Sequence, residues 1–279
     1  MTQAIQFERH EESAAFFSPL AAMAFAEDRI EVRTDPLTGM TAIASAGLEA
    51  KEEMFLGKTD WAYADLLVSR SREGCFFCPE KVFEATPKYP DELVPGGRLQ
   101  RGRALVFPNL FPLAALHAVV TYPERHFLRP SEFTPSLLEE GLGAAVDVAR
   151  RAAAHSPALT HVSVCCNHMP PGGASLVHPH LQVFGGQTVP WLVQFYWDRS
   201  ADWLRRHGES YWRTLVEQEQ ALGERYVWGV AGVHWLVPFA PAGAREALAV
   251  VPGAGRVTDL DDEHIAAIAH GLTRILTWY

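Results

Sequence analysis

The alternation of apolar and polar positions predicts β-strands in several short segments of the chain. Residues 30–47, IEVRTDPLTGMTAIASAG, are typical of strand, turn and strand, because β-branched runs flank Asp35-Pro36 and Gly39. Two strand-like runs, 104–107 and 117–122, enclose a loop bracketed by prolines. The same pattern predicts further strands at 160–168, 226–239 and 246–252.

Three other segments show helical spacing. Residues 135–155 place their apolar side chains as an amphipathic helix does. Residues 198–224 are charged and helical in character, and 261–279 form a final helix with Asp and Glu in its first turn. The segment 74–97 is rich in turn residues and is expected to be mostly irregular. Together these elements predict an α+β protein.

A weak internal repeat suggests how these elements are organised. FPLAALHAVVTYP at 111–123 and APAGAREALAVVP at 240–252 share two prolines at the same interval, with a strand before the second proline and a helix after it. We interpret them as two copies of one α+β unit, the second of which is incomplete. The expected domains are therefore 1–190, the first repeat, and 191–279, a connecting helical segment with the partial second repeat.

Composition narrows the class of protein. The 279-residue chain is 48% apolar and 20% charged, which is ordinary for a soluble globular protein. A net charge of −9 without a Lys/Arg-rich run gives no reason to expect nucleic acid as a partner. We expect no membrane association, since no run of about 18 apolar residues occurs. The N-terminus lacks a signal layout, so we expect the cytoplasm, where the four cysteines would be metal ligands or buried thiols.

The segment GASLVHPHLQVFGGQ at 173–187 carries the most specific chemistry. His178, His180 and Gln182 alternate within an otherwise apolar strand, and alternate residues share a face. Pro179 lacks a ladder donor, so the strand should be interrupted there or lie at an edge. Two half-buried structural histidines are the plainer interpretation. If a metal holds one imidazole, however, the other can attack an electrophile, with Gln182 donating to an oxygen that gains charge.

Cys75 and Cys78 form a Cys-x-x-Cys pair in the turn-rich segment. This spacing lets two thiolates reach one zinc ion, although two buried thiols would also explain it. A tetrahedral site needs two more ligands, for which His126 and His178 are the best candidates. A redox role fits poorly, because it would require a helix start after a βαβ strand.

A Pro/Gly-rich loop leads into the histidine segment. It contains Asn167, Gly172, Gly173 and Ser175. Glycines allow a backbone to approach a phosphate closely, and Ser and Asn add hydrogen-bond donors, although most such loops are only turns. Taken with the neighbouring histidines, the loop is consistent with transfer of a phosphorus-centred group through a phospho-histidine.

These residues resemble galactose-1-phosphate uridylyltransferase and its nucleotidyltransferase relatives in the histidine-triad superfamily, including ADP-glucose phosphorylase-like proteins. The resemblance covers roughly 31–279. It rests on six stretches in the family's order: VRTDPLTG, CFFC, VFPNLFP, AVVTYPERH, NHMPPGGASLVHPHLQ and VHWLVPFAP. The implied fold is histidine-triad-like, with antiparallel sheets and helices, and the implied assembly is a homodimer.

The resemblance also implies residue roles. Cys75, Cys78, His126 and His178 would bind a structural Zn²⁺ ion. His180 would be the nucleophile that takes the nucleotidyl group, and Gln182 would contact its phosphate. The remaining positions would bind substrate: Asn167, Gly173 and Ser175 along the phosphate path, Asn109 near the nucleoside, and Arg33 near phosphates, in some members across a dimer interface.

Three features depart from the family pattern. Leu181 replaces the small residue usual between the second histidine and the glutamine. GLEAKEE at 47–53 is acidic where the family has an arginine-rich segment. The family's C-terminal half-repeat, with its sugar contacts, is expected to be absent after Tyr279, so sugar specificity cannot be inferred from this chain.

The predicted function is a ping-pong nucleotidyltransferase that acts on a UDP- or ADP-sugar, with a sugar 1-phosphate or another phosphate as acceptor. A phosphorylase or hydrolase of NDP-sugars or adenine dinucleotides is an alternative within the enzymes. Gln182 favours transfer, since hydrolases of the superfamily tend to carry histidine there. A non-catalytic, zinc-stabilised nucleotide-binding relative is the third possibility.

Overall fold

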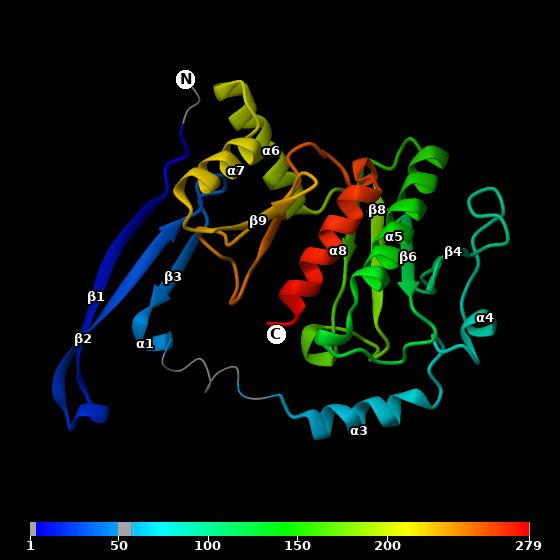
Figure 1. The fold of residues 1–279 in the computed structure, drawn as a ribbon, viewed down its shortest axis with the longest axis horizontal. Helices are drawn as coiled ribbons and strands as arrows, with labels where there is room; N and C mark the ends of the chain where they lie inside the picture. The colour runs from blue at the N-terminus through cyan, green and yellow to red at the C-terminus, as the bar shows by residue number, and fades with distance from the viewer. Residues whose placement is uncertain (1–3, 50–56, 58, 279) are drawn as a thin grey trace. The chain divides into compact units, whose positions relative to one another are not determined.

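The computed structural model describes residues 4–49, 57 and 59–278 and forms two compact units (Figure 1). Unit 1 combines Met1–Asp60, Trp191–Gly229 and His234–Pro252. Unit 2 combines Trp61–Pro190, Val230–Val233 and Gly253–Tyr279. The division into 1–190 and 191–279 stays a prediction, as does the incomplete second repeat. Most of the acidic GLEAKEE stretch, from residue 50 onward, lies outside the described residues.

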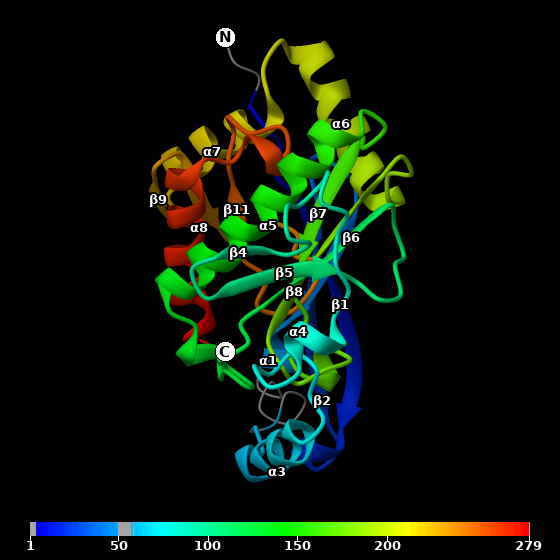
Figure 2. The same cartoon turned by 90° about the vertical axis from the view of Figure 1, so that its right-hand side faces the viewer.

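Unit 2 is built on a five-stranded antiparallel sheet in the order β4-β5-β6-β8-β7 (Figure 2). Its strands are β4 (Leu99–Arg101), β5 (Ala104–Pro108), β6 (Leu116–Thr121), β7 (His161–Cys165) and β8 (His180–Gly186). The helices α3 (Trp61–Arg72) and α4 (Val82–Ala85) precede the sheet in the chain. The predicted α+β fold with antiparallel sheets and helices is confirmed.

The helix α5 (Pro135–His155) covers one face of this sheet. Thr134 caps its first turn by accepting a hydrogen bond from Leu137 N at 3.3 Å, and Pro135 occupies the first helical position, where its missing N–H costs nothing. α8 (Asp262–Leu276), capped by Asp261, packs against α5. No helix among the described residues has the length and apolar character needed to cross a membrane.

Alternation along the strands separates the two faces of the sheet. Val106, Val120 and Val183 pack in the core beneath α5. Their neighbours Leu105, Phe107 and Val119 pack instead with Cys75, Phe77, Cys78 and Val82 on the opposite face. Because Leu181 and Val183 belong to the α5 core, His180 and Gln182 belong to the face that carries the Cys-x-x-Cys segment.

Gly141 allows α5 to pack closely against Tyr122, the residue that follows β6. A Cβ atom added at Gly141 would overlap the buried hydroxyl of Tyr122. We therefore expect Gly141→Ala to destabilise the protein in urea unfolding by about 1–3 kcal/mol, despite the gain in helix propensity. Tyr122→Phe, which removes the clashing oxygen, should restore part of the loss. An equal loss for Gly172→Ala, whose Cβ would meet nothing within 4 Å, would contradict this explanation.

Unit 1 contains two three-stranded sheets. One has the order β1-β2-β3, from β1 (Glu8–Ser18), β2 (Ala24–Thr34) and β3 (Thr41–Ser45), followed by α1 (Ala46–Glu49). The other has the order β11-β10-β9, from β9 (Tyr226–Val230), β10 (Val233–Leu236) and β11 (Leu248–Val250). The segment 198–224, predicted as helical, is covered by two helices, α6 (Trp191–His207) and α7 (Tyr211–Leu222). α6 begins before the predicted segment, and Gly208, with φ +74°, separates the two helices.

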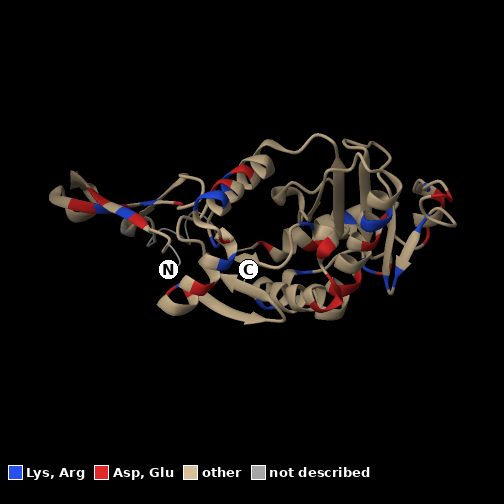
Figure 3. Ribbon diagram, turned by 90° about the horizontal axis from the view of Figure 1, so that it is seen from above, with Lys and Arg blue, Asp and Glu red and all other residues tan. Residues whose placement is uncertain are grey.

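The sequence analysis predicted no strand before residue 30, so it missed β1 and the first part of β2. Every residue of β1 except the last is exposed, so its sequence lacks the alternation that marks a half-buried strand. Acidic and basic residues share this ribbon (Figure 3), and Arg9 lies 3.8 Å from Glu31 on the paired strand. Surface ion pairs of this kind contribute little to stability, so the ribbon is held together mainly by the backbone hydrogen bonds between β1 and β2.

Candidate functional site

Four buried side chains of unit 2 form a Cys₂His₂ cluster: Cys75, Cys78, His126 and His178. They come from three loops, between α3 and α4, after β6 and before β8. One potential ligand atom from each residue lies within 4.8 Å of the others. The structure thus brings together all four residues predicted as metal ligands, and the cluster could bind a metal ion.

The geometry of the cluster fits a tetrahedral ion. His178 Nδ1 lies 3.5 Å from Cys75 Sγ and 3.7 Å from Cys78 Sγ, and His126 Nδ1 lies 3.2 Å from Cys78 Sγ. In a tetrahedral zinc site with ligand distances of 2.0–2.3 Å, ligand atoms are about 3.6 Å apart. The outer nitrogens are also held: His178 Nε2 lies 3.0 Å from Tyr122 O, and His126 Nε2 lies 3.2 Å from Val68 O. Donation from Nε2–H leaves each Nδ1 lone pair directed into the cluster.

Burial disfavours the charged forms of three members of this cluster, Cys78, His126 and His178, in the absence of a cation. Burial, and then the neighbouring Cys75, raise the pKa of Cys78 to about 12. Burial likewise lowers the pKa of His178 to about 4 and that of His126 below its ordinary value. A bound cation would reverse the effect on the Cys78 thiol, because its charge favours the thiolate. Two neutral imidazoles and two thiolates are a donor set suited to zinc.

His180 lies directly after this cluster, as the first residue of β8, and is 6% exposed. Its Nδ1 lies 2.8 Å from the carbonyl oxygen of His178, to which it donates. Nε2 then carries the lone pair, and it has no hydrogen-bond partner among the described residues. Burial lowers the pKa of His180 from its ordinary value, which favours the neutral ring. The Phe77 ring packs against both imidazole rings, with its centroid 5.8 Å from that of His178 and 5.6 Å from that of His180.

Pro179 separates the two histidines where the strand begins. β8 starts at His180, so His178 belongs to the preceding loop and not to the predicted strand. Of the two predicted alternatives, an interruption at Pro179 or an edge strand, the first holds, because β8 begins only after Pro179 and lies between β6 and β7. Thr121, paired with His180 across the ladder, donates its hydroxyl to Pro179 O at 3.2 Å. A proline immediately before a central strand costs no ladder bond within it.

Gln182 is held by His117, a residue that the sequence analysis did not identify. The backbone N–H of Leu113 donates to His117 Nδ1 at 3.0 Å, which places the ring proton on Nε2. Nε2–H then donates to Gln182 Oε1 at 3.0 Å. The side-chain nitrogen of Asn109 lies 3.2 Å from the same Nε2 and, being a donor itself, does not accept from it. Gln182 is left with its amide N–H groups to offer to a ligand.

The remaining predicted substrate-binding residues occupy two places. Asn167 and Ser175 are exposed in the loop before β8, and Asn167 Nδ2 donates to Gly173 O at 3.4 Å. Gly173 has φ +88°, a conformation that favours glycine. Arg33 belongs to unit 1, where it pairs with Glu31 and donates to Phe239 O at 3.3 Å. The substrate-binding roles of these residues stay predictions.

Comparison of the sequence with known proteins does not assign it to a family. No protein-family model matches the sequence. An uncharacterised protein from Archaeoglobus fulgidus is 27% identical over 255 residues, covering 91% of this chain and 72% of its own length.

Three solved structures are similar to the chain over most of its length. A GalT-like protein and an ADP-glucose phosphorylase with bound ADP-glucose, both from Arabidopsis thaliana, align at TM-scores of 0.65 with 19% and 20% identity. Each alignment covers 89% of this chain, and 76% and 77% of the two relatives. A uridylyltransferase aligns at 0.58 with 21% identity, covering 87% and 72%. The chain therefore has the GalT-like fold of these structures, as the motifs predicted.

Proposed function

We propose that this protein moves a nucleoside monophosphate from a UDP- or ADP-sugar to a phosphate-bearing acceptor through a covalent nucleotidyl-His180. The observation that carries the proposal is the state of the His180 ring: Nδ1 is anchored to His178 O at 2.8 Å, which leaves Nε2 as the nucleophilic nitrogen. The fold supports it, since structures with that fold include a uridylyltransferase and an ADP-glucose phosphorylase with bound ADP-glucose.

The chemistry needs no proton transfer at the attacking nitrogen. The Nε2 lone pair forms a bond to the α-phosphorus, and the bond from that phosphorus to the bridging oxygen breaks, so sugar 1-phosphate leaves with the electron pair. Positive charge develops on the ring while Nδ1–H stays bonded to His178 O, a hydrogen bond that strengthens as the ring becomes cationic. A phosphate oxygen of the acceptor then attacks the same phosphorus, and the P–N bond breaks.

Gln182 serves this step as a donor to the phosphate oxygens that gain charge. Its Oε1 is engaged by His117, so its amide N–H groups would be the ones to donate to the phosphate. Gly173, with its positive φ, and the exposed Asn167 and Ser175 would provide backbone and side-chain donors along the phosphates. Asn109, beside His117, would bind near the nucleoside, and Arg33 would contact phosphate, in keeping with the family resemblance.

The ion proposed for the Cys₂His₂ cluster is Zn²⁺, held by Cys75, Cys78, His126 and His178. Four protein ligands leave no open position, so its role is structural. It would fix the loop that supplies the carbonyl of His178, and therefore the orientation of the His180 ring. We further propose a cytoplasmic homodimer. The exposed apolar side chains at the end of the β1–β2 ribbon, Phe17, Leu20, Met23 and Phe25, support a protein interface.

The same intermediate could be resolved by orthophosphate or by water. A phosphorylase is the second candidate function, because ADP-glucose phosphorylase has this fold. Products of wild-type turnover with and without orthophosphate or a sugar 1-phosphate separate transfer, phosphorolysis and hydrolysis. A non-catalytic nucleotide-binding relative is the third candidate, and it would form no covalent intermediate.

The intermediate can be trapped directly. UDP-glucose or ADP-glucose labelled at the α-phosphorus should leave label on the wild-type protein, stable in alkali and located by peptide mapping at His180. His180→Gly should carry none, because the nucleophile is gone. His155→Gly, a change in an exposed histidine at the end of α5, should label normally. If no NDP-sugar labels the wild type above the His180→Gly background, the proposal is wrong.

A further inference from the structure

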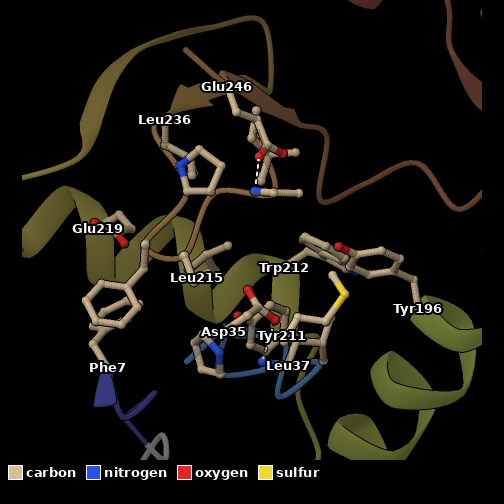
Figure 4. Close-up of a pocket in the computed structure, with 17 residues that line it drawn as sticks. Phe7, Asp35, Leu37, Tyr196, Tyr211, Trp212, Leu215, Glu219, Leu236 and Glu246 are labelled. Atoms are coloured by element: carbon tan, nitrogen blue, oxygen red, sulfur yellow. Dashed lines mark hydrogen bonds between the residues drawn. The ribbon is translucent and has the colours of Figure 1, made fainter. Parts of the chain in front are cut away.

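Unit 1 contains a cavity that plays no part in the chemistry proposed above (Figure 4). Its volume is about 350 Å³, within the range of small-molecule sites. Every lining residue belongs to unit 1, whereas the Cys₂His₂ cluster and His180 belong to unit 2. The inference below therefore stands whether or not the protein transfers nucleotides.

Five aromatic side chains contribute to the walls of this cavity. Tyr196 from α6 lies beside Trp212 from α7, with ring centroids 6.3 Å apart, and Tyr211 packs edge-on against Trp212 at 5.3 Å. Phe7 and Phe239 form another part of the wall, with centroids 4.9 Å apart. Such a surface favours a flat or compact apolar body. Because Arg225 already lies over Phe7 and Phe239, at 4.5 and 5.2 Å from their ring centroids, Tyr196 and Trp212 are the rings that would attract a ligand's positive charge.

The charged side chains that line the cavity are all carboxylates. Asp35, Glu219 and Glu246 are lining residues, and no Lys, Arg or His is among the lining side chains within the described residues. Glu219 is 0% exposed, with Oε1 paired to Arg225 at 2.8 Å and Oε2 buried without a partner. An unpartnered buried acceptor costs free energy that a ligand donor would recover.

Asp35 and Glu246 each use one carboxylate oxygen for hydrogen bonds to the backbone, which leaves the other oxygen to accept from a ligand. Asp35 uses Oδ1 for its own turn, accepting from Leu37 N and Thr38 N at 3.1 and 2.8 Å. Glu246 accepts from Ala242 N at 2.6 Å through Oε2. Neither is paired with a Lys or Arg in the described part of the chain. The pKa of Tyr196 is raised by burial and then by Asp35 and Glu246, so both charges act on the aromatic wall.

We propose that this cavity binds a small organic ammonium ion that carries an apolar, preferably aromatic, body. The body would occupy the aromatic part of the walls, and the ammonium N–H groups would bond to the free oxygens of Asp35 and Glu246, with the buried charge of Glu219 adding to the negative potential of the cavity. Cation–π attraction to Tyr196 and Trp212 adds to this preference. Phosphates, nucleotides and carboxylic acids are disfavoured, because each would bring negative charge to carboxylates with no cationic partner in the lining.

Three compounds with the same body test the charge preference. 2-Phenylethylammonium, 2-phenylethanol and 3-phenylpropionate are titrated into the full-length protein by calorimetry at neutral pH and low salt. The ammonium compound should bind at least about tenfold more tightly than the alcohol, a difference of about 1.4 kcal/mol, and the carboxylate should not bind. Equal binding of all three, or no binding of the ammonium compound up to about 10 mM, would overturn the proposal.

Isosteric variants locate the site. Asp35→Asn and Glu246→Gln keep the oxygens that accept from the backbone but remove charge, so each should weaken binding of 2-phenylethylammonium about three- to tenfold without unfolding the protein. Trp212→Leu should weaken it through loss of the aromatic wall. Glu217→Gln removes the same charge from the exposed face of α7 and should bind as the wild type does. Weakening by Glu217→Gln equal to that by Glu246→Gln would show only a general charge effect and contradict the proposal.

Discussion

If the Cys₂His₂ cluster binds zinc as proposed, a Cys75→Ser protein is expected to purify with much less zinc than the wild type and to unfold at a much lower temperature. Structural zinc binding in small domains supplies about 10–16 kcal/mol of apparent free energy, and even a fraction of that rivals the total stability of a domain, about 5–15 kcal/mol. The effect should exceed that of an ordinary core truncation, because Cys75 also packs in the core with Phe77 and Phe107. Metal analysis and thermal unfolding measure the two consequences separately.

Cys165→Ser is the matched control for this change. Cys165 is an exposed thiol at the end of β7, outside the cluster, so its replacement should leave metal content and unfolding temperature unchanged. Chelation of the wild type should reproduce the Cys75→Ser phenotype. Unchanged zinc content and unfolding temperature in Cys75→Ser would show that the cluster is two buried thiols and two structural histidines, without a metal.

Local signals in the sequence were sufficient for the helix α5. The spacing of apolar residues predicted a helix at 135–155, and α5 has those bounds, with Thr134 as its cap and Pro135 at its first position. The β1–β2 ribbon could not be predicted in the same way, since exposed positions carry no periodicity. The segments 104–107 and 117–122 were predicted as strands, but both are buried on each face, so the sequence did not indicate which face α5 would cover. That choice depends on tertiary packing.

The Cys₂His₂ cluster and His117 illustrate two different limits of predicting a site from sequence. Only the Cys-x-x-Cys spacing is local. His126 and His178 were chosen as the best candidates for the other two ligands, and the family resemblance implied the same pair, but their loops meet the cysteines only in the fold. His117 sits in LHAVVT, where alternation predicts a buried strand residue and nothing more. Its role depends on a hydrogen bond from Leu113 in the loop and on the register that sets β6 against β8. A polar side chain within a buried strand is the signal that could have identified it.

Replacing His117 with phenylalanine is expected to slow nucleotidylation of His180 by about 10- to 100-fold, the usual effect of losing a residue that orients another functional group. Phenylalanine keeps a ring against Phe184, whose centroid lies 4.2 Å from that of His117, but it cannot donate to Gln182 Oε1. Gln182→Ala should lower the rate further, by about 10²–10³, because it removes the donor itself. Rapid-quench labelling with the NDP-sugar that labels the wild type measures both rates.

The double variant distinguishes positioning from a general structural effect. If His117 acts through Gln182, the His117→Phe/Gln182→Ala protein should label no more slowly than Gln182→Ala alone, because nothing remains to be oriented. Multiplying effects would instead show that His117 supports the site independently. Nitrogen NMR of the wild-type ring adds a readout that needs no substrate: the hydrogen bond from Leu113 predicts the Nε2–H tautomer. A ring protonated on Nδ1 would rule out the relay to Gln182, whatever the kinetics of the variants.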